Sequence, residues 1–208
     1  VLLITGFALR YPESWWALGL ARMGMDEGLR GNIHRAAGVI LILTSLYHAY
    51  YILATRRGRR ELAAFLPDRR DWKDLIQNLR YHTFRSREKV EFGRYDYSQK
   101  AEYWALVWGT ALMALTGLVL WFPTVVVRVL PGIVIPASQT IHFYEAVLAG
   151  LVILVWHFFF VVFHPEEYPM SWTWLTGKMT RKSAQTHHGR WYREVLQAEA
   201  EPTEEPGD

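Results

Sequence analysis

Four histidines are paired by their positions in two apolar stretches of the sequence. His34 and His48 are fourteen residues apart in one stretch, and His142 and His157 are fifteen residues apart in the other. On an α-helix these separations correspond to about 21–22 Å of length and keep both rings within about 60° of one face. Imidazole is a common metal ligand. Two such helices packed together therefore predict two metal-binding levels, each with two histidines.

The number of ligands at each level indicates what is bound there. Zinc in proteins takes three or four side-chain ligands, whereas haem iron needs only two axial ligands because the porphyrin occupies the other positions. Apolar helical bundles also suit such a cofactor. The sequence contains no cysteine, which excludes covalent c-type haem and thiolate-bound iron–sulfur clusters. We therefore predict two b-type haems, one between His34 and His142 and one between His48 and His157.

Charged and apolar residues are segregated along the chain, in which 51% of the residues are hydrophobic. Residues 103–122 contain no Asp, Glu, Lys or Arg, and residues 33–54 and 140–163 contain one each. Segments of about twenty apolar residues are long enough to cross a bilayer. The apolar residues 1–9 are interpreted as the end of a truncated first span. The sequence thus predicts an all-α transmembrane four-helix bundle with spans at about 1–9, 33–54, 101–122 and 140–163.

The distribution of basic residues predicts the orientation of these spans. The segment 56–100 carries thirteen Lys and Arg residues, whereas the segment 123–139 carries only Arg128. The positive-inside rule places the first segment in the cytoplasm and the second outside. We therefore expect a multi-pass inner-membrane protein with a membrane domain over 1–164 and a cytoplasmic C-terminal tail over 165–208. The net charge of +3 does not indicate a nucleic acid partner, because the basic residues lie next to the predicted membrane spans, where anionic lipid accounts for them.

Several further residues allow two interpretations each. Trp72, Leu75, Ile76 and Leu79 have the spacing of an apolar helix face, which lies either in the inner membrane interface or against a partner subunit. Arg30 and Arg35 are either partners of haem propionates or interfacial anchors. Glu145 either hydrogen-bonds within the outer haem pocket or extends outward. His164, after His157 on the same face, is interpreted as an interfacial histidine, and its alternative role is at the edge of the inner haem.

Three segments resemble one family of respiratory subunits. The segment 95–123 reads YDYSQKAEYWALVWGTALMALTGLVLWFP, residues 187–201 read HHGRWYREVLQAEAE, and residues 4–9 read ITGFAL. These segments are similar to the third helix, the C-terminal tail and the first helix of the cytochrome b (gamma) subunit of membrane-bound formate dehydrogenases. Residues 163–179, FHPEEYPMSWTWLTGKM, also resemble the wider group of b-type cytochromes that anchor nickel–iron hydrogenases.

The resemblance implies four transmembrane helices, two haems b and a quinone site near the inner haem. It assigns the outer haem to His34 and His142 and gives the inner haem His157 together with a histidine near the start of the first helix. His48 departs from the family pattern. The partner of His157 is therefore either His48, by geometry, or a residue that precedes this sequence. In the second case His48 lines the quinone pocket or serves a further haem.

The resemblance also implies a quinone site just before the third helix. The matching positions are Tyr95, Asp96, Ser98, Gln99 and Lys100, with Asp96 and Ser98 standing where the family has Asn and Gly. A carboxylate at Asp96 is suited to passing protons to a reduced quinone. Asp96 and Ser98 are equally suited to capping the helix that follows them.

We therefore predict a dihaem cytochrome b subunit of a respiratory oxidoreductase complex. It transfers electrons across the membrane between an extracytoplasmic partner and the quinone pool, either menaquinone or ubiquinone. The partner is a set of iron–sulfur and catalytic subunits or a multihaem cytochrome, and the primary substrate chemistry belongs to those partners. One alternative is an electron carrier that uses no quinone. A second alternative is a haem-free membrane scaffold or transporter whose histidines relay protons.

Overall fold

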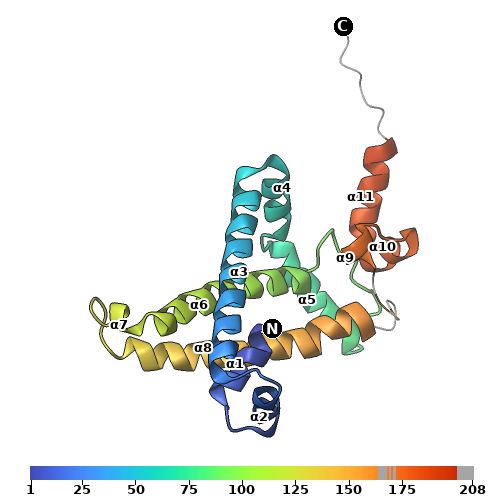
Figure 1. The fold of residues 1–208 in the computed structure, drawn as a ribbon. Coiled ribbons are helices and arrows are strands. Elements are labelled where there is room, and N and C mark those ends of the chain that lie inside the picture. The colour runs from blue at the N-terminus through green and yellow to red at the C-terminus, as the bar shows by residue number, and fades with distance from the viewer. Residues whose placement is uncertain (164–167, 169, 171, 201–208) are drawn as a thin grey trace. The chain divides into compact units, whose positions relative to one another are not determined.

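The described part of the chain is entirely helical (Figure 1). The computed structural model describes residues 1–163, 168, 170 and 172–200, so His164 and the acidic end of the tail, 201–208, lie outside the described residues. The chain divides into two compact units. Unit 1 contains Val1–Thr55 and Leu106–Phe160, and unit 2 contains Arg56–Ala105 and the described part of 161–208.

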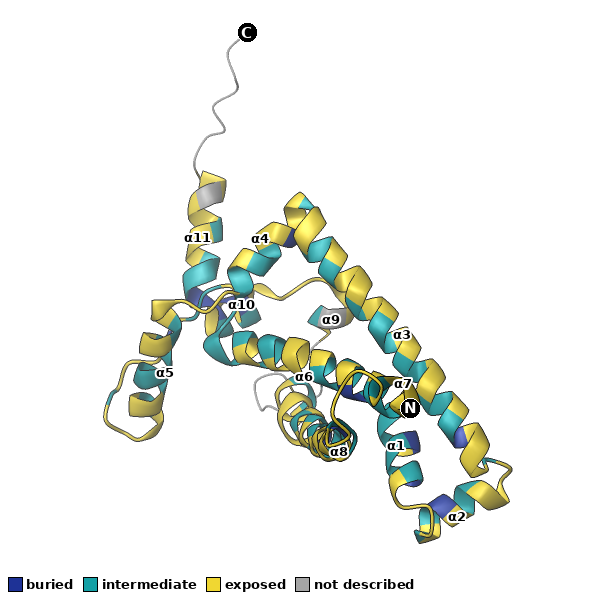
Figure 2. Cartoon of the chain, turned by 90° about the vertical axis from the view of Figure 1, so that its left-hand side faces the viewer, coloured by how far each residue is buried: buried dark blue, intermediate teal, exposed yellow. Residues whose placement is uncertain are grey.

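Three helices are long and apolar enough to cross a membrane, as the sequence predicts. They are α3 (Glu27–Ala54), α6 (Tyr97–Trp121) and the continuous helical segment Val134–Phe163, which begins with α8 (Val134–Leu151). Most of their residues are exposed or only partly buried in the isolated chain (Figure 2). Apolar surface of this extent requires cover from lipid or from other protein chains. The structure therefore supports a membrane protein.

The predicted four-helix bundle is seen only in part. The remaining predicted span, residues 1–9, corresponds to α1 (Leu2–Arg10), a helix of 9 residues that packs against α3. At 1.5 Å per residue, α1 is about 14 Å long, roughly half of the hydrocarbon thickness of a bilayer. Moreover, α3 runs across α8 instead of alongside it (Figures 1 and 2). The fold of unit 1 is therefore all-helical with three candidate spans, and a closed bundle is not confirmed.

Local capping residues explain where the long helices begin. The Asp26 side chain accepts a hydrogen bond from the backbone N–H of Leu29, so α3 starts six residues before the predicted apolar window. Asp96 accepts hydrogen bonds from the N–H groups of Ser98 and Gln99 at 2.7 and 2.8 Å and thereby caps α6. Both long helices thus begin in polar residues before the apolar sequence starts.

The segment after α8 is wound more widely than an α-helix. Two π-helical stretches, η1 (Val152–His157) and η2 (Phe159–Phe163), continue α8. The angular position expected for His157 assumes a regular step of about 100° per residue. This assumption is wrong from Val152 onward, because a π-helix has more residues per turn. Such wide turns in helices frequently occur at functional sites.

Unit 2 gathers the loop after α3 and the C-terminal tail. Its helices in chain order are α4 (Arg56–Phe65), α5 (Arg69–His82), the start of α6, α9 (Thr173–Thr176), α10 (Arg181–His187) and α11 (Gly189–Ala200). The amphipathic helix predicted around Trp72 is confirmed as α5, and Trp72 is 66% exposed. Arg190 of α11 forms an ion pair with Asp74 of α5 at 2.9 Å. The described helix α11 of the tail is therefore tied to α5 of the loop by this ion pair. Two short helices complete the described chain, α2 (Trp15–Arg22) in unit 1 and α7 (Pro123–Val126) between α6 and α8.

Candidate functional site

His34 of α3 and His142 of α8 lie next to each other within unit 1, with their rings arranged edge to face. The centres of their imidazole rings are 6.3 Å apart and the ring planes are inclined by 70°. Both rings are half-buried, in helices of spanning length and apolar composition. Titratable side chains in such helices are costly and usually functional. The structure thus brings together the two histidines that the sequence predicts for the outer level.

A threonine from a neighbouring helix holds each of these histidines. The hydroxyl of Thr5, on α1, lies 3.0 Å from Nδ1 of His34, and the hydroxyl of Thr116, on α6, lies 2.9 Å from Nδ1 of His142. Both threonines are buried, at 3% and 6% exposure. In each imidazole, Nδ1 therefore contacts a threonine of a neighbouring helix.

A glycine follows each of these threonines and makes room for the same ring. A Cβ atom added to Gly6 would lie 3.1 Å from Cε1 of His34, and one added to Gly117 would lie 3.3 Å from Cε1 of His142. Most Cβ atoms in proteins do not approach their neighbours this closely. Any residue with a Cβ atom would push these rings aside. The close approach therefore explains why both positions are glycine.

The separation of the two rings fits one metal atom between them. A metal–imidazole bond is about 2 Å long, and a ring nitrogen lies roughly 1.1 Å from the ring centre, so two ligands in line place their ring centres about 6 Å apart. The observed 6.3 Å agrees with this value. Within the described residues, no group of three or more His, Cys, Asp or Glu side chains is placed to hold a metal ion. The donor set therefore suits haem iron, which needs two axial ligands, better than zinc.

Three charged side chains lie within five residues of His34 or His142 in the sequence. The Arg30 side chain, one turn before His34, is only 3% exposed and donates to the Ala17 carbonyl at 3.2 Å. Among the described residues, its Nε is the one buried side-chain nitrogen or oxygen without a hydrogen-bond partner. Arg35 lies over the ring of Trp121 at 5.7 Å, as expected for an interfacial anchor. The Glu145 carboxylate is turned toward Gly109 of α6 and lies against it.

The two histidines predicted for the inner level are placed differently. His48 and His157 are both exposed side chains in the isolated chain. The C-terminal part of α3, which carries His48, runs away from the segment that follows α8 (Figures 1 and 2). His157 is the last residue of the π-helical stretch η1. The inner level therefore stays a prediction.

The five residues predicted for quinone contact take part in local structure of unit 2. Asp96 caps α6, and its own N–H donates to Oε1 of Gln99 at 3.1 Å, which completes a reciprocal cap. The Lys100 ammonium donates to both carboxylate oxygens of Asp71 at 2.9 Å. These contacts confirm that Asp96 caps the helix, and the quinone site stays a prediction.

Tyr95 connects this segment to α4. Its hydroxyl donates to Oε2 of Glu61 at 3.1 Å, and its ring stacks on Phe65 with ring centres 4.0 Å apart. Burial raises the pKa of the Tyr95 hydroxyl above its usual value, and the positive charge of Arg94 partly opposes this shift. The Tyr95 hydroxyl therefore stays protonated near neutral pH and acts as a donor to Glu61.

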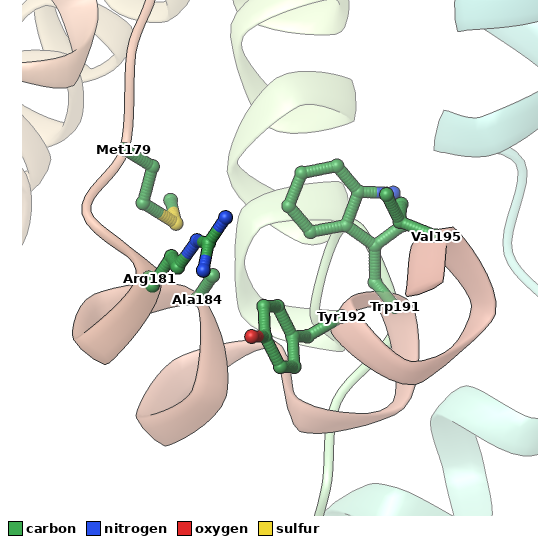
Figure 3. Close-up of a pocket in the computed structure, with 6 residues that line it drawn as sticks. All are labelled: Met179, Arg181, Ala184, Trp191, Tyr192 and Val195. Atoms are coloured by element: carbon green, nitrogen blue, oxygen red, sulfur yellow. The ribbon is translucent and has the colours of Figure 1, made fainter. Parts of the chain in front are cut away.

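A small cavity in unit 2 was not predicted from the sequence. Its volume is about 190 Å³, and α10 and α11 supply most of its walls. Figure 3 shows the rings of Trp191 and Tyr192 beside the guanidinium of Arg181. The remaining lining residues are Met179, Ala184 and Val195. The only sequence signal for this cavity is the aromatic and basic tail motif at 187–201.

Three apolar helices of spanning length and two neighbouring imidazoles from different helices are features of helical membrane proteins that bind a cofactor between their helices. The sequence profile of one such family, described as prokaryotic cytochrome b561, matches residues 1–174. The chain belongs to the prokaryotic cytochrome b561 family. Membership of a cytochrome b family implies haem b as cofactor, and electron transport as the general role.

Similar proteins confirm the resemblance to formate dehydrogenase cytochromes. The cytochrome b556(Fdn) subunit of the nitrate-inducible formate dehydrogenase of Escherichia coli (strain K12) is 26% identical over 148 residues, which are 68% of this chain and 63% of that protein. The cytochrome b556(fdo) subunit of formate dehydrogenase from the same strain is 25% identical over 195 residues, or 92% and 82% of the two chains. This chain thus spans less than two thirds of the first relative.

Proposed function

We propose that this protein is the membrane-embedded dihaem cytochrome b subunit of a respiratory oxidoreductase complex, and that it carries electrons between an extracytoplasmic partner and quinone. The observation that carries the proposal is the His34–His142 pair at 6.3 Å, with Nδ1 of each ring turned to a threonine. Bound haem b supplies a one-electron carrier that exchanges electrons without proton transfer at the iron. His34 and His142 hold the outer haem in this proposal, and His157 and His48 are assigned to the inner one.

Arg30 supports an acidic cofactor at the outer level. Its guanidinium is buried one turn from His34, and its Nε has no partner among the described residues. Burying an unpaired cation is costly, whereas a carboxylate neutralises it and accepts its free N–H. The propionate groups of a haem supply such carboxylates. Arg30 therefore serves in this proposal as a propionate partner.

The orientation and partners follow the charge distribution and the relatives. In this proposal the segment 56–100 and the C-terminal tail lie in the cytoplasm, which the thirteen basic residues of that segment support. His34 and His142 then lie toward the extracytoplasmic side of an inner membrane. Two of the similar proteins are named as subunits of formate dehydrogenases. Catalytic and iron–sulfur subunits of such a complex, or a multihaem cytochrome, are the partners proposed on that side.

Counting the haem per polypeptide in the purified full-length protein tests this function. We expect two b-type haems by pyridine haemochrome assay, and one in His157→Ala. His48→Ala separates the two proposals for the partner of His157: one remaining haem assigns His48 as the ligand, and two remaining haems assign the ligand to a residue outside this sequence. A wild-type protein without haem in the intact membrane complex contradicts the proposed function and favours a scaffold or transporter.

The quinone proposal is tested at Asp96, where capping and proton transfer can be separated. Asn caps a helix about as well as Asp, whereas Ala loses about 0.5–2 kcal/mol of stability. If the Asp96 carboxylate passes protons to quinone, Asp96→Asn keeps the thermal stability of the wild type and slows quinone reduction by the complex at least about tenfold. Asp68→Asn, at the capping residue of α5 and outside the predicted quinone segment, is the control for a change of cap. Full quinone turnover in Asp96→Asn assigns Asp96 to capping alone and contradicts proton transfer from this carboxylate to quinone.

A further inference from the structure

Unit 1 contains two similar halves that the linear sequence does not make obvious. A Thr-Gly pair occurs in α1 at Thr5 and Gly6 and again in α6 at Thr116 and Gly117. Each pair contacts a histidine that follows an isoleucine in the next long helix, at His34 and at His142. The threonine precedes its histidine by 29 residues in one half and by 26 in the other. Both halves thus present an imidazole in the same way.

The hydrogen bonds of the threonines determine which ring nitrogen carries the proton. A threonine hydroxyl has one proton and two acceptor positions. The Thr5 hydroxyl donates to the Val1 carbonyl at 3.0 Å, and the Thr116 hydroxyl donates to the Leu112 carbonyl at 2.6 Å. With its single proton used in this way, each hydroxyl accepts a hydrogen bond from the ring. Both imidazoles are therefore protonated on Nδ1, and their Nε2 atoms carry a free lone pair.

We infer that Thr5 and Thr116 are positioning residues for the two axial ligands of the outer haem, an inference that rests on the proposed function. Each threonine fixes the tautomer that leaves Nε2 free to bind iron, and each fixes the rotation of the ring. The glycine beside each threonine brings the supporting helix close enough for this contact. Each of the two histidines is held by one Thr-Gly pair, so both proposed ligands have the same kind of support.

This support also affects the electronic character of the iron. A hydrogen bond accepted from Nδ1–H increases the electron donation of the imidazole and favours the oxidised iron. Replacing either threonine by valine, which has nearly the same shape, removes this acceptor and leaves the ligand itself in place. Thr5→Val and Thr116→Val are therefore expected to raise the midpoint potential of the outer haem and to lower its haem affinity by about tenfold or more.

The experiment is an optical redox titration of the purified full-length protein, combined with a haem count. Because Thr5 and Thr116 support ligands of the same iron, both valine variants shift the same redox component upward. Thr5→Ser and Thr116→Ser retain the hydroxyl, so in these variants the same redox component is expected to keep its wild-type potential. This rescue separates a positioning role from loss of a packed methyl group.

Thr44→Val is the matched control. The Thr44 hydroxyl also donates to the carbonyl four residues earlier, Ile40 at 2.8 Å, and it lies on α3 without a contact to His34 or His142. If Thr5→Val and Thr116→Val have the potential and haem content of Thr44→Val, or if they shift different components, the inference is overturned while the haem protein stands. If the wild type binds no haem, the proposed function itself fails.

Discussion

His34→Ala and His142→Ala are each expected to lose one b-type haem, and to lose the same one. The two ring centres lie 6.3 Å apart, and in the proposed site both rings bind one iron, so removing either ring takes away one of its two axial ligands. The partner helix supplies no replacement, because no third His, Cys, Asp or Glu is placed for metal binding in the described chain. Haem counting and redox titration of each purified variant check this result.

The double variant and a distant histidine provide the controls. His34→Ala combined with His142→Ala loses one haem in total, because both side chains serve one iron and their effects do not add. His82→Ala, at the end of α5 in unit 2, keeps the wild-type haem content. Loss of two haems in the double variant, or loss of different redox components in the single variants, contradicts a shared iron at His34 and His142.

The outer pair of histidines was predictable because both members lie in regular helix. From α3 and α8, hydropathy predicts the spans and a step of about 100° per residue predicts the ring positions. His157 was less predictable, since it ends a π-helical stretch in which that step does not hold. The helix starts at Glu27 and Val134 also precede the apolar windows, because caps and turns determine them.

The supporting residues could not be identified by helical periodicity. A threonine in an apolar helix usually bonds its own backbone, as Thr44 does, and only the packing of α1 on α3 shows that Thr5 also contacts His34. The recurrence of Thr-Gly and Ile-His in the two halves was the available signal. The pairing of Arg190 with Asp74, 116 residues apart, likewise depends on tertiary folding that no local pattern specifies.

The glycines of unit 1 make a second prediction with a large effect. Gly6→Ala and Gly117→Ala place a Cβ atom 3.1 and 3.3 Å from Cε1 of His34 and His142. An imidazole held by both a threonine and a metal cannot move away, and overpacking of this kind costs about 1–3 kcal/mol. We expect haem affinity to fall by about 5- to 150-fold, since each 1.4 kcal/mol is a tenfold change.

In the haem-free protein the same substitutions are expected not to lower the stability of the helices. Alanine is favoured over glycine within a helix by about 1 kcal/mol, so the helices carrying Gly6→Ala and Gly117→Ala are not weakened when no metal fixes the rings. Gly38→Ala is the matched control, because it lies on α3 and a Cβ atom there meets nothing within 4 Å. The Gly38→Ala variant should be stabilised by the same helix propensity and should keep the haem affinity of the wild type. Haem retention during titration with a competing apoprotein measures this affinity. Equal haem retention in all three variants would show that the glycine positions beside the histidines do not limit the approach of the rings to the iron.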